Sequence, residues 1–261
     1  MPVVRLRPDT LDEENRRFVQ VPLRQPLFLN SVPKSGSHLL RNILRMFVPV
    51  DQHYSAQFIQ FANLQDHLDA FEATRNYLSW GHLLFSDASA IETSKVRRVL
   101  LVRDPYSWVL ARARFFLSEE FDGNIEFLKE GRLGIGELLN LMIFGIHCKA
   151  PSLAEIFQFN AVAWLGTGAH LLRYEELAAH VKTLDEPGAE AYFSELLAAC
   201  GIAMPQDWRE RVRIGSDRKQ SATASENLTV LPIELPKTLP GAQQRLVDFA
   251  APNLRQLLGY A

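Results

Sequence analysis

Residues 27–38 read LFLNSVPKSGSH and combine an apolar run with a polar loop. The run Leu27–Val32 has no polar alternation until its end, which is typical of a parallel strand buried on both faces. Pro33–Gly36 then form a tight loop, and apolar residues recur at helical spacing from Leu39 to Phe47. The sequence therefore predicts a strand that passes through a short loop into a helix.

A second unit of the same kind begins at Arg97. Val99–Val102 is a short apolar run, so we predict another buried strand, followed directly by Arg103. Asp104 suits a helix N-cap and Pro105 suits a first helical turn. We expect this second helix to reach about Phe116.

The rest of the chain continues the alternation of strands and helices. Weaker strand patterns cover 77–80 and 171–174, and helical patterns cover 55–75, 134–147, 152–165, 189–200 and 241–258. We therefore predict an α/β fold in three layers, with a mostly parallel central sheet flanked by helices, and one domain over 1–261. Such sheets bind ligands beyond the carboxyl ends of their strands, where the loops after 32 and 102 lie.

The composition is that of an ordinary globular protein. Lysine and arginine number 28 against 30 aspartates and glutamates, which gives a net charge of −2, and 47% of the residues are hydrophobic. This argues against disorder and against proteins that coat nucleic acid or an anionic membrane. The longest apolar run, 138–148, is shorter than the ~20 residues of a membrane span, so we predict a buried helix. No secretory signal is recognisable, and Cys148 and Cys200 lie in apolar stretches, so we expect buried thiols and a cytoplasmic location.

The first loop has features of a phosphate site. Its backbone N–H groups and the positive end of the following helix dipole face the crevice at the sheet edge. Gly36 permits close backbone approach, Ser35 and Ser37 add hydroxyl donors, and Lys34 adds a compact charge. The spacing is not that of a Walker A loop. A plain turn with a solvated lysine accounts for the hexapeptide equally well.

The two loops together resemble one enzyme family. P-K-S-G-S-H at 33–38 and V-R-D-P at 102–105 are similar to the 5′-phosphosulfate loop and the 3′-phosphate motif of sulfotransferases that use 3′-phosphoadenosine 5′-phosphosulfate (PAPS). The resemblance implies a P-loop-like core, PAPS as donor, 3′-phosphoadenosine 5′-phosphate (PAP) as product, and no metal. It implies that Lys34 is catalytic and that Lys34, Ser35, Gly36, Ser37, His38 and Arg103 bind the donor. Taken singly, Arg103 is better explained by an ion pair with a neighbouring acid such as Asp104 than by a phosphate contact.

Two further pieces fit the same family. His82, in the sequence W-G-H-L, resembles the histidine of the family motif K-x-H-L, which implies a general base. A neutral imidazole can accept a proton from an alcohol, although a hydrogen-bonded structural histidine remains the alternative. R-Y-E-E-L at 173–177 resembles a family motif whose tyrosine lies near the adenine, which assigns Tyr174 to donor binding. A strand running into a helix with an acidic first turn explains the same residues. The resemblance covers 27–177.

The chain departs from the family pattern in three places. The family serine eight residues after the arginine is Ala111 here, and the lysine two residues before the histidine is Trp80. The usual C-terminal phosphate loop is absent from the sequence. Its nearest candidate is the basic stretch around Gly215, within a nucleotide-closing segment over 205–230, where we assign Arg218 and Lys219 to the 3′-phosphate. A solvated helix face is the alternative reading of that stretch.

The sequence leaves the acceptor open. An apolar region after the second motif, from Phe115 to His147, either lines a pocket for an aromatic or lipid-like alcohol or belongs to the core. We expect a hydroxyl of a small molecule, lipid or glycan as acceptor, no nucleic-acid partner and no membrane span, with a homodimer left open. The losses at Ala111 and Trp80 motivate an alternative, a catalytically inactive nucleotide-binding or interaction domain. A P-loop kinase is a further alternative, which the position of Lys34 disfavours.

Overall fold

The computed structural model describes residues 3–4, 8–55, 58–118, 121–122, 125–220 and 234–260. Its internal contacts divide the chain into two compact units. Unit 1 comprises 1–7, 103–158 and 222–261, and unit 2 comprises 8–102 and 159–221.

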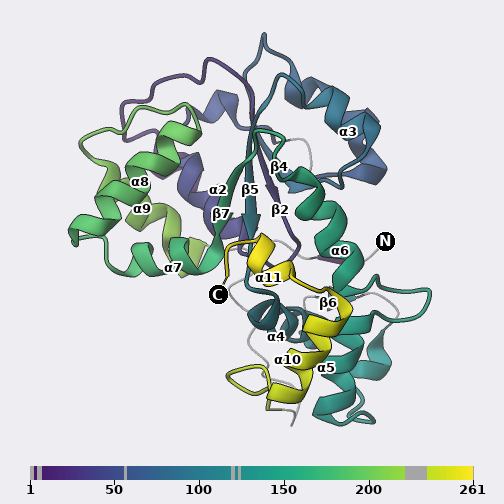
Figure 1. The fold of residues 1–261 in the computed structure, drawn as a ribbon. Coiled ribbons are helices and arrows are strands. Elements are labelled where there is room, and N and C mark those ends of the chain that lie inside the picture. Colours follow the sequence, from purple (N-terminus) through teal and green to yellow (C-terminus); the bar gives the residue numbers. More distant parts are fainter. Residues whose placement is uncertain are drawn as a thin grey trace. The chain divides into compact units, whose positions relative to one another are not determined.

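Unit 2 is built on a five-stranded parallel sheet in the order β3-β4-β2-β5-β7 (Figure 1). Its strands are β2 (Leu27–Ser31), β3 (Ile59–Gln60), β4 (Leu78–His82), β5 (Arg97–Val102) and β7 (His170–Arg173). Every residue of β2 is buried, as the unbroken apolar run predicts for a central parallel strand. The predicted α/β fold class and the parallel sheet are thus confirmed.

Helices of unit 2 cover both faces of this sheet. They are α1 (Leu11–Asn15), α2 (Ser37–Arg45), α3 (Asp87–Glu92), α7 (Tyr174–Lys182), α8 (Pro187–Ala199) and α9 (Trp208–Ser216), with the 3-10 helices η1 (Val50–Gln52), η2 (Phe61–Phe71), η4 (Val162–Trp164) and η5 (Arg218–Gln220). Figure 1 shows α2, α8 and α9 on one side of the strands and α3 on the other. Side chains alternate along β2, so Leu27 and Leu29 join the core under α2 while Phe28 packs edge-on against Phe71 at 5.5 Å.

The segment 55–75 differs from the predicted helix. The short strand β3 pairs with the end of β4, and the 3-10 helix η2 follows, with a kink at His67. Strand β3 approaches β4 so closely that a Cβ on Gly81 would lie 1.9 Å from the Ile59 carbonyl oxygen. Pairing at the sheet edge, made possible by this glycine, outweighs the local helical pattern.

Unit 1 consists mainly of helices. They are α4 (Pro105–Leu117), α5 (Ile135–Phe144), α10 (Gly241–Ala250), α11 (Leu254–Leu257) and η3 (Glu126–Leu128), with the antiparallel pair β1 (Val3–Val4) and β6 (Phe121–Asp122); α6 (Leu153–Asn160) spans the division between the units. Asp104 caps α4 by accepting from the Tyr106 N–H at 3.1 Å, which confirms the predicted N-cap. The helix predicted over 241–258 is divided in two, because Pro252 cannot continue the hydrogen-bond ladder and Asn253 is left-handed with φ 61°.

The apolar stretch 138–148 forms most of α5, whose buried face includes Leu138, Leu139, Met142 and Ile143. The expectation of two buried thiols is half wrong. Cys200 is buried, whereas Cys148 is exposed in the turn after α5, with φ 55°. Within the described residues, no helix combines the length and the apolar character that a bilayer crossing needs.

Candidate active site in unit 2

The loop between β2 and α2 has an unusual backbone. Lys34 and Gly36 both adopt left-handed conformations, with φ 67° and 89°, and Gly36 is the N-cap of α2. The Ser35 N–H bonds to the Val32 carbonyl at 3.2 Å, which closes the turn. The first N–H groups of a helix have no partner within the helix, so this turn presents donors at the carboxyl end of β2.

Ser35 adds an unsatisfied polar atom to the loop. Its side chain is fully buried, and its Oγ has no hydrogen-bond partner among the described residues. A buried hydroxyl without a partner costs about 1–3 kcal/mol, so such atoms in native sites commonly await a ligand or water. Both the backbone geometry of the loop and its side-chain donors are therefore suited to binding an anion.

Tyr174 lies directly against this loop. It is the first residue of α7, at the end of β7, and a Cβ on Gly36 would come within 2.4 Å of its ring. Any larger residue at 36 would meet both this ring and the left-handed backbone. The structure thus places Tyr174 beside Gly36. The sequence related these two residues only through the resemblance to family motifs.

His82 ends β4, the neighbour of β2, and is held in one tautomer. Its Nδ1 lies 2.9 Å from the Ser31 carbonyl oxygen and 3.0 Å from the Ser31 Oγ. Because a carbonyl only accepts, Nδ1 carries the proton and donates it, which leaves the lone pair on Nε2. Burial lowers the pKa of His82 to about 3, and the positive charges of Lys34 and His38 add to the decrease. The imidazole is therefore neutral at physiological pH.

Trp80 lies two residues before His82 and so on the same face of β4. Its ring meets the His38 ring edge-on at 4.9 Å and the Phe58 ring at 4.8 Å, while the Arg41 guanidinium lies over it at 4.8 Å. Burial, with Arg41 and Lys34, lowers the pKa of His38 to about 4. The sequence did not single out Arg41 as a site residue. Its position one helical turn after His38 places both residues on the same face of α2 and could have indicated such a role.

The structure brings Lys34, Gly36, His38, His82 and Tyr174 together in unit 2, whereas Arg103 belongs to unit 1. Arg103 directly follows β5, and its Nε donates to the Ser107 Oγ at 2.9 Å.

Next to Arg103, the carboxylate of Asp104 pairs with Arg255 at 3.0 Å. Ala111, at the position where the resemblance implies a serine, is buried in α4. Ser107, one turn before it, places a hydroxyl beside Arg103 that sequence reasoning did not single out.

The basic stretch near the C-terminus is largely structural. Arg211 is buried in α9, where it donates to the Met46 carbonyl at 2.9 Å and pairs with Asp207. Arg218 and Lys219 lie in η5, and both side chains are exposed. The remainder of the predicted closing segment from 221 onwards lies outside the described residues.

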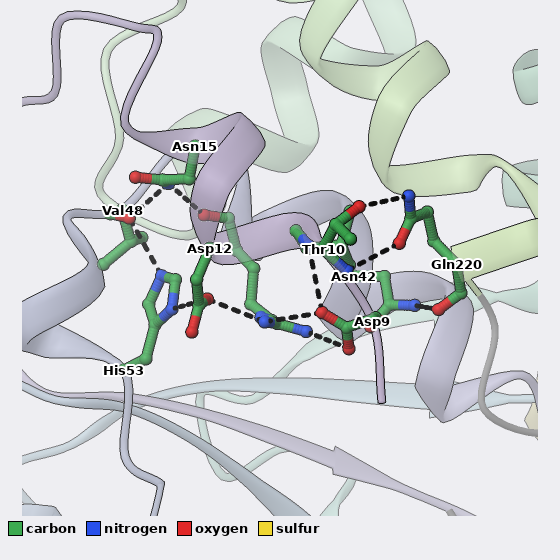
Figure 2. A network of polar contacts seen from close by, with 10 residues as sticks. Asp9, Thr10, Asp12, Asn15, Asn42, Val48, His53 and Gln220 are labelled. Atoms are coloured by element: carbon green, nitrogen blue, oxygen red, sulfur yellow. Dashed lines mark hydrogen bonds and ion pairs between the residues drawn. The ribbon is translucent and has the colours of Figure 1, made fainter. Parts of the chain in front are cut away.

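A polar network holds the opposite end of α2 (Figure 2). Arg45 pairs with Asp9 at 2.8 Å and with Asp12 at 2.7 Å, and Asp12 also contacts His53 at 3.2 Å. The side-chain Oε1 of Gln220, in η5, accepts from the Thr10 N–H at 3.0 Å. The backbone carbonyl of Gln220 accepts from the Asn42 side-chain amide at 3.1 Å. These contacts fasten α1 and η5 to α2.

Comparison of the sequence with protein-family models gives no match, and comparison with curated proteins gives none either. Among solved structures, the chain is similar to mouse sulfotransferase SULT7A1, crystallised in complex with PAP. The identity is 14%, the TM-score is 0.60, and the match covers 96% of this chain and 94% of that one. A sulfotransferase domain from the curacin biosynthetic pathway matches at 16% identity and a TM-score of 0.39, over 92% and 99% of the two chains. The match to the mouse enzyme, at a TM-score of 0.60, shows that the chain has the sulfotransferase fold.

Proposed function

We propose that this protein is a PAPS-dependent sulfotransferase, in which residues 1–261 act as one functional domain. It moves a sulfuryl group to a hydroxyl of a small-molecule, lipid or glycan acceptor and releases PAP. The observation that carries this proposal is the pairing, at the ends of adjacent strands, of an anion-binding loop with a histidine whose Nε2 lone pair is available. The likeness to a sulfotransferase fold crystallised with PAP supports it.

Several residues would hold the donor. The N–H groups of Gly36 and Ser37, the Ser35 hydroxyl and the Lys34 ammonium would bind the 5′-phosphosulfate end, consistent with the buried, unpartnered Ser35 Oγ. Tyr174, packed beside Gly36, would contact the adenine side. Arg103, aided by the Ser107 hydroxyl, would bind the 3′-phosphate, and the exposed Arg218 and Lys219 are the proposed further cations for it. Ser37 and His38, in the first turn of α2, complete the proposed donor site.

The donor supplies an activated sulfuryl group, so the chain contributes positioning and charge. By analogy with phosphoryl transfer, we expect a loose, in-line displacement. The acceptor oxygen forms its bond to sulfur as the bond from sulfur to the phosphate oxygen breaks. Lys34 would neutralise the charge that appears on the departing oxygen, and Nε2 of His82 would take the proton of the acceptor hydroxyl. The Ser31 carbonyl then stabilises the resulting imidazolium through Nδ1.

The low pKa of His82 has two consequences for this role. It keeps the base deprotonated before the acceptor arrives, and it makes the free imidazole a weak base. Burial is the main cause of the decrease, and the positive charge of Lys34 adds to it; His38, whose own pKa is about 4, adds to it only where it is protonated. A bound dianion next to Lys34 would offset the effect of that lysine. Donor binding is therefore expected to strengthen the base.

A catalytically inactive nucleotide-binding domain is the second candidate, favoured by Trp80 and Ala111 at positions where the resemblance implies polar residues. Titration calorimetry with PAP, combined with a transfer assay from PAPS to a broad panel of alcohols, separates the two. Binding with transfer supports the sulfotransferase. Binding without transfer to any alcohol favours the inactive domain, and magnesium-dependent ATP binding in place of PAP would point to a kinase.

A further inference from the structure

Arg41 is a cation for which the sulfotransferase motifs provide no role. It lies in the middle of α2, one turn after His38, and its guanidinium is stacked over the Trp80 ring at 4.8 Å. Within the part of the chain that the structure describes, no carboxylate forms an ion pair with it. Its side chain is partly buried and retains some exposure.

The surroundings of Arg41 are unfavourable for an isolated charge. Burial lowers the pKa of Arg41 to about 10, and the neighbouring Arg45 adds to the decrease, while Asp9 and Asp12, which pair with Arg45, oppose it in part. On its other side lies His38, whose protonation Arg41 in turn opposes. A desolvated guanidinium that forms no ion pair of its own is stabilised when an anion binds to it, and its planar fork matches a carboxylate or a similar oxyanion.

The position of Arg41 relative to the proposed base indicates what that anion belongs to. The Phe58 ring contacts both Trp80, at 4.8 Å, and His82, at 4.7 Å, so the two aromatic rings connect the arginine with the base. His38, whose ring meets the Trp80 ring at 4.9 Å, feels the charges of both Arg41 and Lys34. The geometry that links Arg41 to the proposed base is therefore the pair of aromatic rings, Trp80 and Phe58.

We propose that Arg41, supported by Trp80, is a subsite for an anionic group of the acceptor. The acceptor is then a hydroxyl compound that also carries a carboxylate or comparable oxyanion, with its apolar body against Trp80 and Phe58 and its hydroxyl at His82. This inference rests on the proposed function for the roles of His82 and the donor loop. Trp80, which replaces a family lysine, becomes the platform that holds the arginine.

Matched pairs of probes test this subsite on the full chain. Mandelate, ricinoleate and lithocholate represent an aromatic, a long-chain and a steroid hydroxy acid, and each is compared with its primary amide. Calorimetry gives the affinity ratio of acid to amide, with and without saturating PAP. For at least one pair we expect the wild-type protein to prefer the acid by about tenfold to a hundredfold, the range for a charge-assisted hydrogen bond.

Variants assign that preference to Arg41. Arg41→Gln should bring the ratio close to one, and Arg41→Lys, which keeps a charge without the fork, should retain part of it. Arg24→Gln, the same change at an exposed arginine, should leave the ratio unchanged. Circular dichroism and thermal melts verify that each variant is folded. Retention of the preference in a folded Arg41→Gln protein would overturn the subsite.

Other outcomes separate this inference from the proposed function. If no wild-type pair favours the acid, the anionic acceptor is wrong even when PAP binds. If Arg41→Gln weakens PAP binding by the same factor as acid binding, Arg41 serves the donor and the subsite is refuted. PAP binding can fail while the acid-to-amide affinity ratio, measured without PAP, still depends on Arg41. In that case the sulfotransferase assignment fails and the anion subsite stands.

Discussion

Two arginines four residues apart on α2, Arg41 and Arg45, differ in whether a carboxylate pairs with them. Arg45 is 6% exposed and pairs with Asp9 and Asp12, whereas Arg41 lies over Trp80, and no carboxylate among the described residues pairs with it. Burial opposes the charge of both, but the bonds from the two carboxylates raise the pKa of Arg45 above its usual value, while the pKa of Arg41 falls to about 10. The difference separates a charge that supports the fold from one that is available to a ligand. We therefore expect substitutions at the N-terminal end of α2, and at the strand end beside it, to alter function, and those at the C-terminal end to alter stability.

The largest effect is expected at His82. His82→Asn removes the proton acceptor and should lower kcat by about 10²–10⁴-fold, the usual contribution of a general base. Nucleotide binding does not use Nε2, so the Kd for PAP should stay within a few-fold of wild type by calorimetry. A parallel loss of binding and turnover would instead identify a structural histidine.

Lys34→Ala should lower kcat by about 10²–10³-fold, because it removes a preorganised charge at the departing oxygen. Steady-state transfer from PAPS measures the effect, and Lys95→Ala, at an exposed lysine in the turn before β5, serves as the control. Activity of Lys34→Ala within a few-fold of wild type would remove this residue from the mechanism.

Arg45→Gln probes the other end of the helix. Removing the guanidinium leaves Asp9 and Asp12 without their shared partner, so we expect the free energy of unfolding to fall by about 3 kcal/mol. Urea denaturation measures this loss. At temperatures where the variant is folded, its affinity for PAP should match that of wild type. A loss of PAP binding without a loss of stability would contradict the assignment of function to the N-terminal end of α2 and of stability to its C-terminal end.

The smallest effect is expected in the acid limb of the pH profile. A base loses activity as pH falls through its pKa, and the pKa of His82 in the free protein is lowered to about 3 by burial, Lys34 and His38. The kcat/KM for transfer should therefore stay level from about pH 8 down to about pH 5. A tenfold fall per pH unit beginning near pH 6.5 would show an ordinary histidine.

The sequence predicted the central strands and the loop after Val32 because a strand buried on both faces leaves an unbroken apolar run. It did not predict β3, since pairing with β4 depends on the close approach at Gly81, which local periodicity does not reveal. The contrast between Arg41 and Arg45 was equally hidden. Their partners are distant in sequence and meet them only in the fold: Trp80 lies on β4, Asp9 lies just before α1, and Asp12 lies within α1.

The most direct test of the account is a crystal structure of the protein with PAP. We predict that the 5′-phosphate lies within hydrogen-bond distance, about 3 Å, of the N–H groups of Gly36 and Ser37 and of the Lys34 ammonium. We also predict that the Ser35 Oγ donates to this phosphate. PAP bound elsewhere, with the loop contacting only solvent, would contradict the central claim that the N-terminal end of α2 is the donor site.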